Sequence, residues 1–260
     1  MMILKVFERL LNIDDIDCKW CVRIMFLLSV VIRCAAFLNP YSDTDFTWLN
    51  SWMASFEAGD AQAASTIPFT SGNIVFLCTA LFALFFTFLM GVLYSALYVR
   101  SFRKKLKERD NDETIKRDDP APAGQLAKRF LILSLFYLAV SLPFALVSSN
   151  LLLFFLIGFP FVFTAPACYL SGDKGMFQSL AYVAKITRGF YLAHIRSLFL
   201  IVLVFLFTDA IAGLVSYVSM TTFYILSAAF SAWNTMAIGR YAGMAYCAMR
   251  EAYEHTVVKS

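Results

Sequence analysis

The chain has 260 residues, of which 60% are hydrophobic and 15% are charged, and its formal net charge is +4. With a mean hydropathy of +0.69, this composition is more apolar than the surface of a globular protein allows, and it excludes a water-soluble fold. The composition therefore predicts an all-α, polytopic integral membrane protein.

The N-terminal residues 1–16 place apolar side chains at helical spacing, with Lys5, Glu8 and Arg9 on the other side. This pattern predicts a helix that either lies on the membrane surface or extends the first membrane span. It is a poor match to a signal peptide, which has a charged start, an apolar core and a small-residue cleavage site.

Six apolar stretches are predicted to cross the membrane, since a helix of about 20 residues spans the hydrocarbon layer. Pro160 and Pro166 interrupt the fourth stretch and are expected to kink or end that helix locally, and the third stretch contains Pro143. The six stretches are residues 21–38, 74–98, 130–147, 151–170, 197–218 and 222–249.

The charged residues are sorted between the connecting segments. A predicted basic loop, residues 100–129, holds ten of the 22 Lys and Arg residues against six acidic ones. A predicted amphipathic helix within residues 171–196 opens near Gly175 and is broken near Gly189. The opposite segments, residues 39–73, 148–150 and 219–221, contain neither Lys nor Arg. Basic loops stay on the cytoplasmic side, so both termini are expected in the cytoplasm of a multi-pass protein of the cell (inner) membrane.

An aromatic repeat lies in the first outer segment. Trp48, Trp52 and Phe56 follow one another at a spacing of four residues. We expect a short helix there with an aromatic face at the outer interface.

Two opposite charges lie deep in predicted spans: Arg33 in the first and Asp209 in the fifth. An isolated charge at that depth costs several kcal/mol, so each needs a partner, a water-filled cavity or a neutral form. Their similar depth predicts an Arg33–Asp209 ion pair between the two helices. A structural clamp is the favoured interpretation of such a pair, with a proton or ion relay and snorkelling of Arg33 as alternatives.

The sixth span carries further polar and small residues. Asn234 and Arg240 add to the predicted intramembrane polar site, with contact of Arg240 with the cytoplasmic headgroups as the alternative. Gly239 and Gly243 form a G-x-x-x-G step that allows close helix packing, either within one chain or across a homodimer.

Catalytic and metal-binding patterns are missing from the sequence, so we expect no enzyme activity, no metal and no cofactor. Cys18 and Cys21 form a C-x-x-C, but no second Cys or His pair lies nearby to complete a zinc site, and no redox-type context surrounds it. The remaining cysteines are interpreted as small apolar groups rather than a disulfide framework.

A basic stripe directly follows the second span. Because of this position it is expected to bind anionic lipid headgroups rather than nucleic acid. The residues expected to do so are Arg100, Arg103, Lys104, Lys105 and Lys107.

The segment 159–207 combines a proline-interrupted span, an amphipathic helix ending in Lys185-Ile-Thr-Arg-Gly-Phe190, and a new span. It resembles the six-span bacterial membrane proteins that include the YciC-like proteins and the membrane domain of some glycerophosphodiester phosphodiesterases. Thr187 and Gly189 fit that pattern, whereas Val183 and Ala184 replace its usual Ser-Trp-like pair. The resemblance implies an inner-membrane protein without phosphodiesterase activity.

The favoured functional hypothesis is a non-enzymatic membrane component, a scaffold or an accessory subunit of a transport or envelope system. Its partners would be the lipid bilayer and another membrane protein or a second copy. The alternative is a small secondary transporter or channel-like protein that uses Asp209 and Arg33. An intramembrane enzyme is the third hypothesis.

Overall fold

The structure, a computed structural model, describes residues 12–59, 69–109, 122–145, 158, 164–172 and 174–258. These ranges form helices and turns without a strand, which confirms the all-α expectation for the described part of the chain. The helices are α2 (Lys19–Phe37), α3 (Trp48–Glu57), α5 (Ser71–Arg109), α6 (Ala123–Ala145), α8 (Ala165–Leu170), α9 (Met176–Ile186), α10 (Tyr191–Ser216) and α11 (Met220–Val258).

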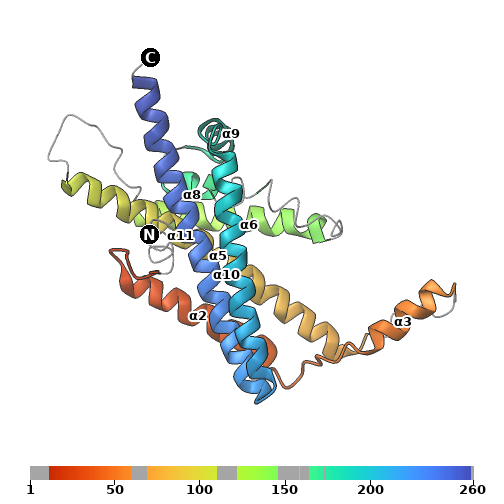
Figure 1. Ribbon diagram of the computed structural model, residues 1–260. Coiled ribbons are helices and arrows are strands. Elements are labelled where there is room, and N and C mark those ends of the chain that lie inside the picture. Colours follow the sequence, from red (N-terminus) through yellow and green to blue (C-terminus); the bar gives the residue numbers. More distant parts are fainter. Residues whose placement is uncertain are drawn as a thin grey trace.

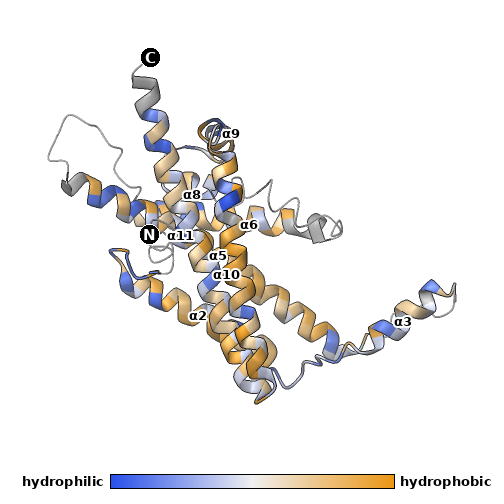
Figure 2. Ribbon diagram, in the orientation of Figure 1, coloured by the Kyte–Doolittle hydropathy of each residue, from blue (hydrophilic) through white to orange (hydrophobic). Residues whose placement is uncertain are grey.

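Four of these helices are long and apolar enough to cross a membrane: α2, residues 71–106 of α5, residues 123–140 of α6, and α10. Only 11–22% of the residues in their apolar stretches are buried inside the protein. Large apolar side chains such as Leu81, Leu135 and Leu206 face outward, and Figure 2 shows hydrophobic colouring along α2, α10 and most of α5. Water would disfavour so much exposed apolar surface, so lipid is the expected surrounding. The chain is therefore a helical membrane protein.

The helix α11 forms the centre of the bundle. In Figure 1 it runs through the middle of the molecule with α10 antiparallel beside it, while α5 crosses behind them. Helix α2 packs against both α5 and α11, whereas α8 and α9 pack against the C-terminal half of α11. Because neighbouring helices surround α11, it tolerates polar residues that a lipid-facing helix excludes, and it is not one of the four strongly apolar helices.

The two ends of the bundle are chemically different. At one end Phe37 lies 5.8 Å from Phe76 and 5.1 Å from Tyr224 between ring centroids, so α2, α5 and α11 meet through aromatic rings. At the other end Arg129 of α6 donates to the carbonyl of Tyr169 at 2.6 Å, and Lys185 lies 5.3 Å from the ring of Tyr253. At this basic end, Arg129 and Lys185 thus hold neighbouring helices together through contacts within the chain.

The predicted basic loop 100–129 is too long. Helix α5 continues through the basic residues to Arg109, and α6 begins at Ala123; residues 110–121 lie outside the described part. Lys, Arg and Glu are good helix formers, so a charged stretch without Gly or Pro continues the helix that precedes it. Ten residues at the start of the predicted loop (100–109) and seven at its end (123–129) are therefore helical.

Other boundaries compare as follows. The short aromatic helix appears as α3, and the amphipathic segment contains α9, which begins after Gly175 and is followed by Gly189 with a φ of +91°. Residues 12–17 form turns rather than the end of a helix, and residues 1–11 of the predicted N-terminal helix lie outside the described part. Most of the predicted fourth span also lies outside it; α8 is the described helix there.

Candidate functional site

Among the described residues, the most deeply buried charged side chain is that of Arg240, in the middle of α11, with 2% of its surface exposed. One of its terminal nitrogens donates to the carbonyl of Asn12, and the other lies 3.2 Å from the carboxylate of Asp15. Its guanidinium lies 5.3 Å from the ring centroid of Tyr98 on α5. The Nε atom has no partner among the described residues. Arg240 thus joins α11 to α5 and to the N-terminal segment.

Residues 12–17 form a turn-rich segment, here called the N-terminal strap, that lies across α5 and α11. The hydroxyl of Tyr94 donates to the carbonyl of Ile13 at 2.8 Å, and the amide of Asp17 donates to Ser101 at 3.2 Å. Ile16 is buried against Tyr94 and other apolar residues of α2, α5 and α11. The strap is therefore held by apolar packing as well as by polar contacts.

Three acidic side chains of the strap each meet a cation. Asp14 lies 3.3 Å from Arg23, Asp15 lies 3.0 Å from Lys105, and Asp17 lies 3.5 Å from Lys104. Partial burial acts to raise the pKa of Asp15, but the hydrogen bonds and charges of Lys105 and then Arg240 outweigh it and hold that pKa below its ordinary value. The negative charges of the strap are thus neutralised by cations of α2, α5 and α11.

These contacts change the expected roles of the basic residues. The guanidinium of Arg240 is enclosed by the strap and Tyr98, which goes against headgroup contact, the alternative considered for this residue. Lys104 and Lys105 pair with strap carboxylates, although half or more of each side chain stays exposed. Contact of the stripe with headgroups, including that of Arg100, stays a prediction; the side chain of Lys107 lies outside the described part.

The two charges expected to pair in the membrane have different surroundings. The Nε of Arg33 donates to Thr87 of α5 at 3.1 Å, and Thr87 in turn donates to the carbonyl of Ala83 at 2.7 Å. The carboxylate of Asp209 is near enough to exert a Coulombic attraction on Arg33. Among the ion pairs of the described residues none joins the two side chains directly, so Arg33 has a hydroxyl as its immediate partner.

Next to Asp209, a polar contact joins α10 to α11. The Asn234 amide donates to Thr208 at 2.9 Å, and the Thr208 hydroxyl donates to the carbonyl of Phe205 at 2.9 Å. Both Asn234 and Thr208 are buried. A buried amide that donates to a neighbouring helix fixes the rotation of one helix against the other.

The glycine step of α11 packs within the chain. A Cβ at Gly239 would collide with the backbone carbonyl of Gly91 in α5, and one at Gly243 would lie 2.9 Å from the carbonyl oxygen of Ser95. Gly91 itself lies against Thr235 of α11. The backbones of α5 and α11 therefore touch along this step, which is the packing that small residues permit.

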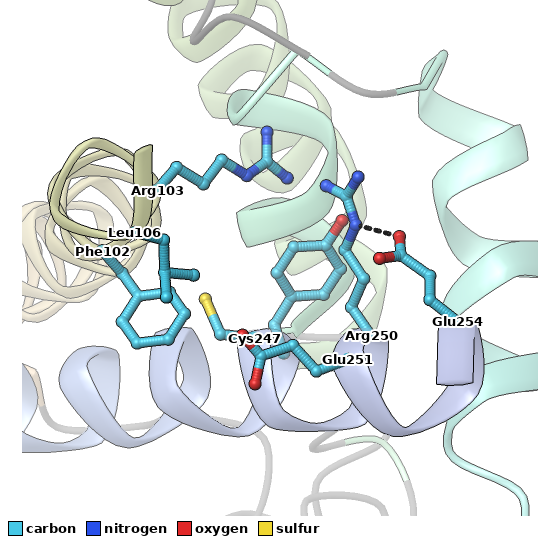
Figure 3. A pocket seen from close by; sticks show the side chains of 8 residues that line it. Phe102, Arg103, Leu106, Cys247, Arg250, Glu251 and Glu254 are labelled. Carbon is cyan, nitrogen blue, oxygen red and sulfur yellow. Dashed lines mark hydrogen bonds and ion pairs between the residues drawn. The ribbon is translucent and has the colours of Figure 1, made fainter. Parts of the chain in front are cut away.

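A small groove lies between the basic end of α5 and the last turns of α11. Figure 3 shows Arg103 extending from α5 toward the same groove as Arg250, whose Nε lies 2.6 Å from Glu254. The lining carries two arginines and two glutamates, so its formal charges cancel and favour no anion. The lining residues are Phe102, Arg103, Leu106, Tyr246, Cys247, Arg250, Glu251 and Glu254.

Two further contacts were not anticipated from the sequence. His194 is buried between the Tyr241 hydroxyl at 2.8 Å and the Met249 sulfur at 3.1 Å. Cys18 and Cys21 form a disulfide with a Cα–Cα distance of 5.4 Å, although no disulfide was expected. The described residues contain no group of three or more His, Cys, Asp or Glu side chains arranged to hold a metal.

Comparison of the chain with protein-family models, curated proteins and solved structures finds no match. The resemblance to the YciC-like group therefore stays a prediction.

Proposed function

We propose that this chain is a non-enzymatic component of a membrane assembly, a scaffold or accessory subunit of a transport or envelope system. Arg240 carries the proposal. Its guanidinium, the most buried charge of the described residues, contacts Asn12 and Asp15 of the strap and the ring of Tyr98 of α5. A charge enclosed in this way fixes which segments of the chain meet and does not present itself to a passing substrate.

The intramembrane polar residues support the same proposal. Arg33 is bonded to Thr87, and Asn234 to Thr208. Each contact joins two helices, as expected for groups that fix packing in a medium where unpaired polar atoms are costly. We include in the proposal the six-span topology, with both termini on the cytoplasmic side of the inner membrane, and membership of the YciC-like group.

The alternative is a small transporter or channel-like protein, and one observation favours it. Asp209 is exposed on the surface of the helix bundle and has no direct ion-pair partner among the described residues, while its charge still acts on Arg33. A carboxylate in this position is suited to exchanging a proton.

Replacement of Asp209 by Asn separates the two functions. The full chain is reconstituted into proteoliposomes with an imposed proton gradient, and both membrane abundance and gradient decay are measured. The scaffold proposal expects the same gradient decay as in empty vesicles for the wild type and the variant. Faster decay with the wild type that is abolished in Asp209→Asn at unchanged abundance would establish the transporter instead. Gly213→Ala is the matched control, because this α10 position has open space around it.

Topology is tested by labelling with a membrane-impermeant maleimide in intact cells. A cysteine at Ser55 of α3 should react from outside, and one at Glu254 of α11 should react only after the cells are opened. Reaction of both positions in intact cells would contradict the proposed orientation.

A further inference from the structure

The disulfide between Cys18 and Cys21 lies where the strap ends and α2 begins. Cys18 precedes the first helical residue, Lys19, and Cys21 lies in the first turn. Cys18 is exposed and Cys21 half-buried. Trp20 between them is 73% exposed, so no other described element covers this turn. An incoming thiol therefore reaches the sulfur of Cys18 more readily than that of Cys21.

The surroundings of Cys18 favour negative charge on its sulfur. The start of α2 has no side-chain cap, so the amides of its first turn point toward the Cys18 position without a competing acceptor side chain. The nearest carboxylate in sequence, that of Asp17, is paired with Lys104 at 3.5 Å, and Asp14 is paired with Arg23 at 3.3 Å. Reactive cysteines in proteins lie in partly exposed, electropositive surroundings, among them helix N-termini and C-x-x-C motifs.

The disulfide contributes little as a structural crosslink. It joins residues three positions apart at one helix start, so it closes a very short loop and connects no two distant elements. The strap and α2 are already held to α5 and α11 by Tyr94, Arg240 and apolar packing. Reduction of the bond therefore leaves the bundle intact.

The other cysteines have different surroundings. Cys168 and Cys247 are buried, whereas Cys34 and Cys78 lie in the apolar stretches of α2 and α5. None of these four is disulfide-bonded. Reversible chemistry is thus confined to the one pair at the end of the strap.

We propose that Cys18 and Cys21 form a redox-active pair that exchanges with low-molecular-weight thiols of the glutathione type. A glutathione thiolate attacks the Cys18 sulfur, the Cys18–Cys21 bond breaks, and Cys21 leaves as a thiolate that takes up a proton. A second glutathione thiolate attacks the glutathione sulfur of the mixed disulfide and releases Cys18, which is also protonated. Two electrons pass from two glutathiones to the protein disulfide, giving one glutathione disulfide and one protein dithiol.

The test uses the full chain in lipid nanodiscs, equilibrated in glutathione buffers of graded reduced-to-oxidised ratio. After an acid quench, free thiols are alkylated and each cysteine is quantified by peptide mass spectrometry. We expect Cys18 and Cys21 to change together, reversibly, as a single two-electron transition, with the alkylation of Cys34 and Cys168 unchanged. Two results would overturn the proposal: thiols that stay free in the most oxidising buffer, or a bond that survives the most reducing one.

Two single variants test the order of attack. With oxidised glutathione, Cys21→Ser should accumulate a mixed disulfide at Cys18, at least about tenfold faster than Cys18→Ser does at Cys21. Equal rates, or a faster reaction at Cys21, would show that the position of Cys18 at the helix start confers no reactivity. Retained tryptophan fluorescence in both variants confirms that each is folded.

Discussion

The contact between Arg240 and Asp15 predicts an unequal response to removing either partner. The Arg240 side chain is 2% exposed, whereas Asp15 is 53% exposed and also pairs with Lys105 at 3.0 Å. Removing Asp15 leaves a buried guanidinium with the Asn12 carbonyl, the Tyr94 hydroxyl and the Tyr98 ring, none of which carries a negative charge. Removing Arg240 leaves a carboxylate that keeps Lys105 and water. The loss of Asp15 should therefore cost more.

The magnitudes follow from the burial of each group. Breaking a fully buried ion pair from one side costs about 3–5 kcal/mol. Because Asp15 is half exposed and the Asn12 contact survives, we expect Asp15→Ala to lower the free energy of unfolding by about 2–3 kcal/mol. Arg240→Met replaces the buried charge by an apolar chain of similar length and should change it by less than about 1 kcal/mol. Lys105→Met, an exposed pair, should stay within about 0.5 kcal/mol.

The assay is reversible unfolding in mixed detergent micelles, followed by tryptophan fluorescence and by far-ultraviolet circular dichroism. Asp15→Asn is the matched control, since it removes the charge but keeps a side chain of the same shape near the guanidinium. An Arg240→Met variant that is destabilised as much as Asp15→Ala would refute the reasoning, because it would mean that the guanidinium stabilises the bundle by more than the cost of its burial.

Three further predictions concern packing, pH and polar contacts. Gly239→Ala should destabilise by about 1–3 kcal/mol through its collision with α5, whereas Gly213→Ala, in open space, should be neutral or stabilising by up to about 1 kcal/mol; the same unfolding assay measures both. The pKa of Asp15 is lowered in the folded chain, so its contribution to stability is complete above its ordinary pKa and is lost as pH falls through the lowered one. Acid titration of unfolding should therefore show a stability loss that Asp15→Asn lacks, and identical profiles would contradict this. Asn234→Leu removes the donor to Thr208 and should lower the free energy of unfolding by about 1 kcal/mol. Thr208→Val removes the acceptor of the same hydrogen bond, so a clearly larger loss for Asn234→Leu would contradict this reasoning.

Local properties of the chain predicted the helices well. Apolar stretches of spanning length predicted α2 to within two residues and most of α5 and α10, although α10 begins six residues earlier and α5 ends eleven residues later than predicted. Gly175 and Gly189 marked the ends of the α9 region. These features depend on composition and periodicity over a single segment, which the sequence displays directly. The prediction is wrong at residues 100–109, where the run of charges predicts a loop although Lys, Arg and Glu are good helix formers.

Ion pairs between segments that lie far apart in the sequence were decided only by the tertiary structure. Asp14, Asp15 and Asp17 lie close together in the sequence, yet no local pattern assigns them to Lys104, Lys105 or Arg240. Asp15 and Arg240 are 225 residues apart. Their contact depends on the depth and rotation at which α2, α5 and α11 pack, and that is decided by steric fit along the Gly91–Gly239 step. The sequence determined that the chain folds in lipid as helices; only the packing of those helices decided which charges are enclosed and which stay at the surface.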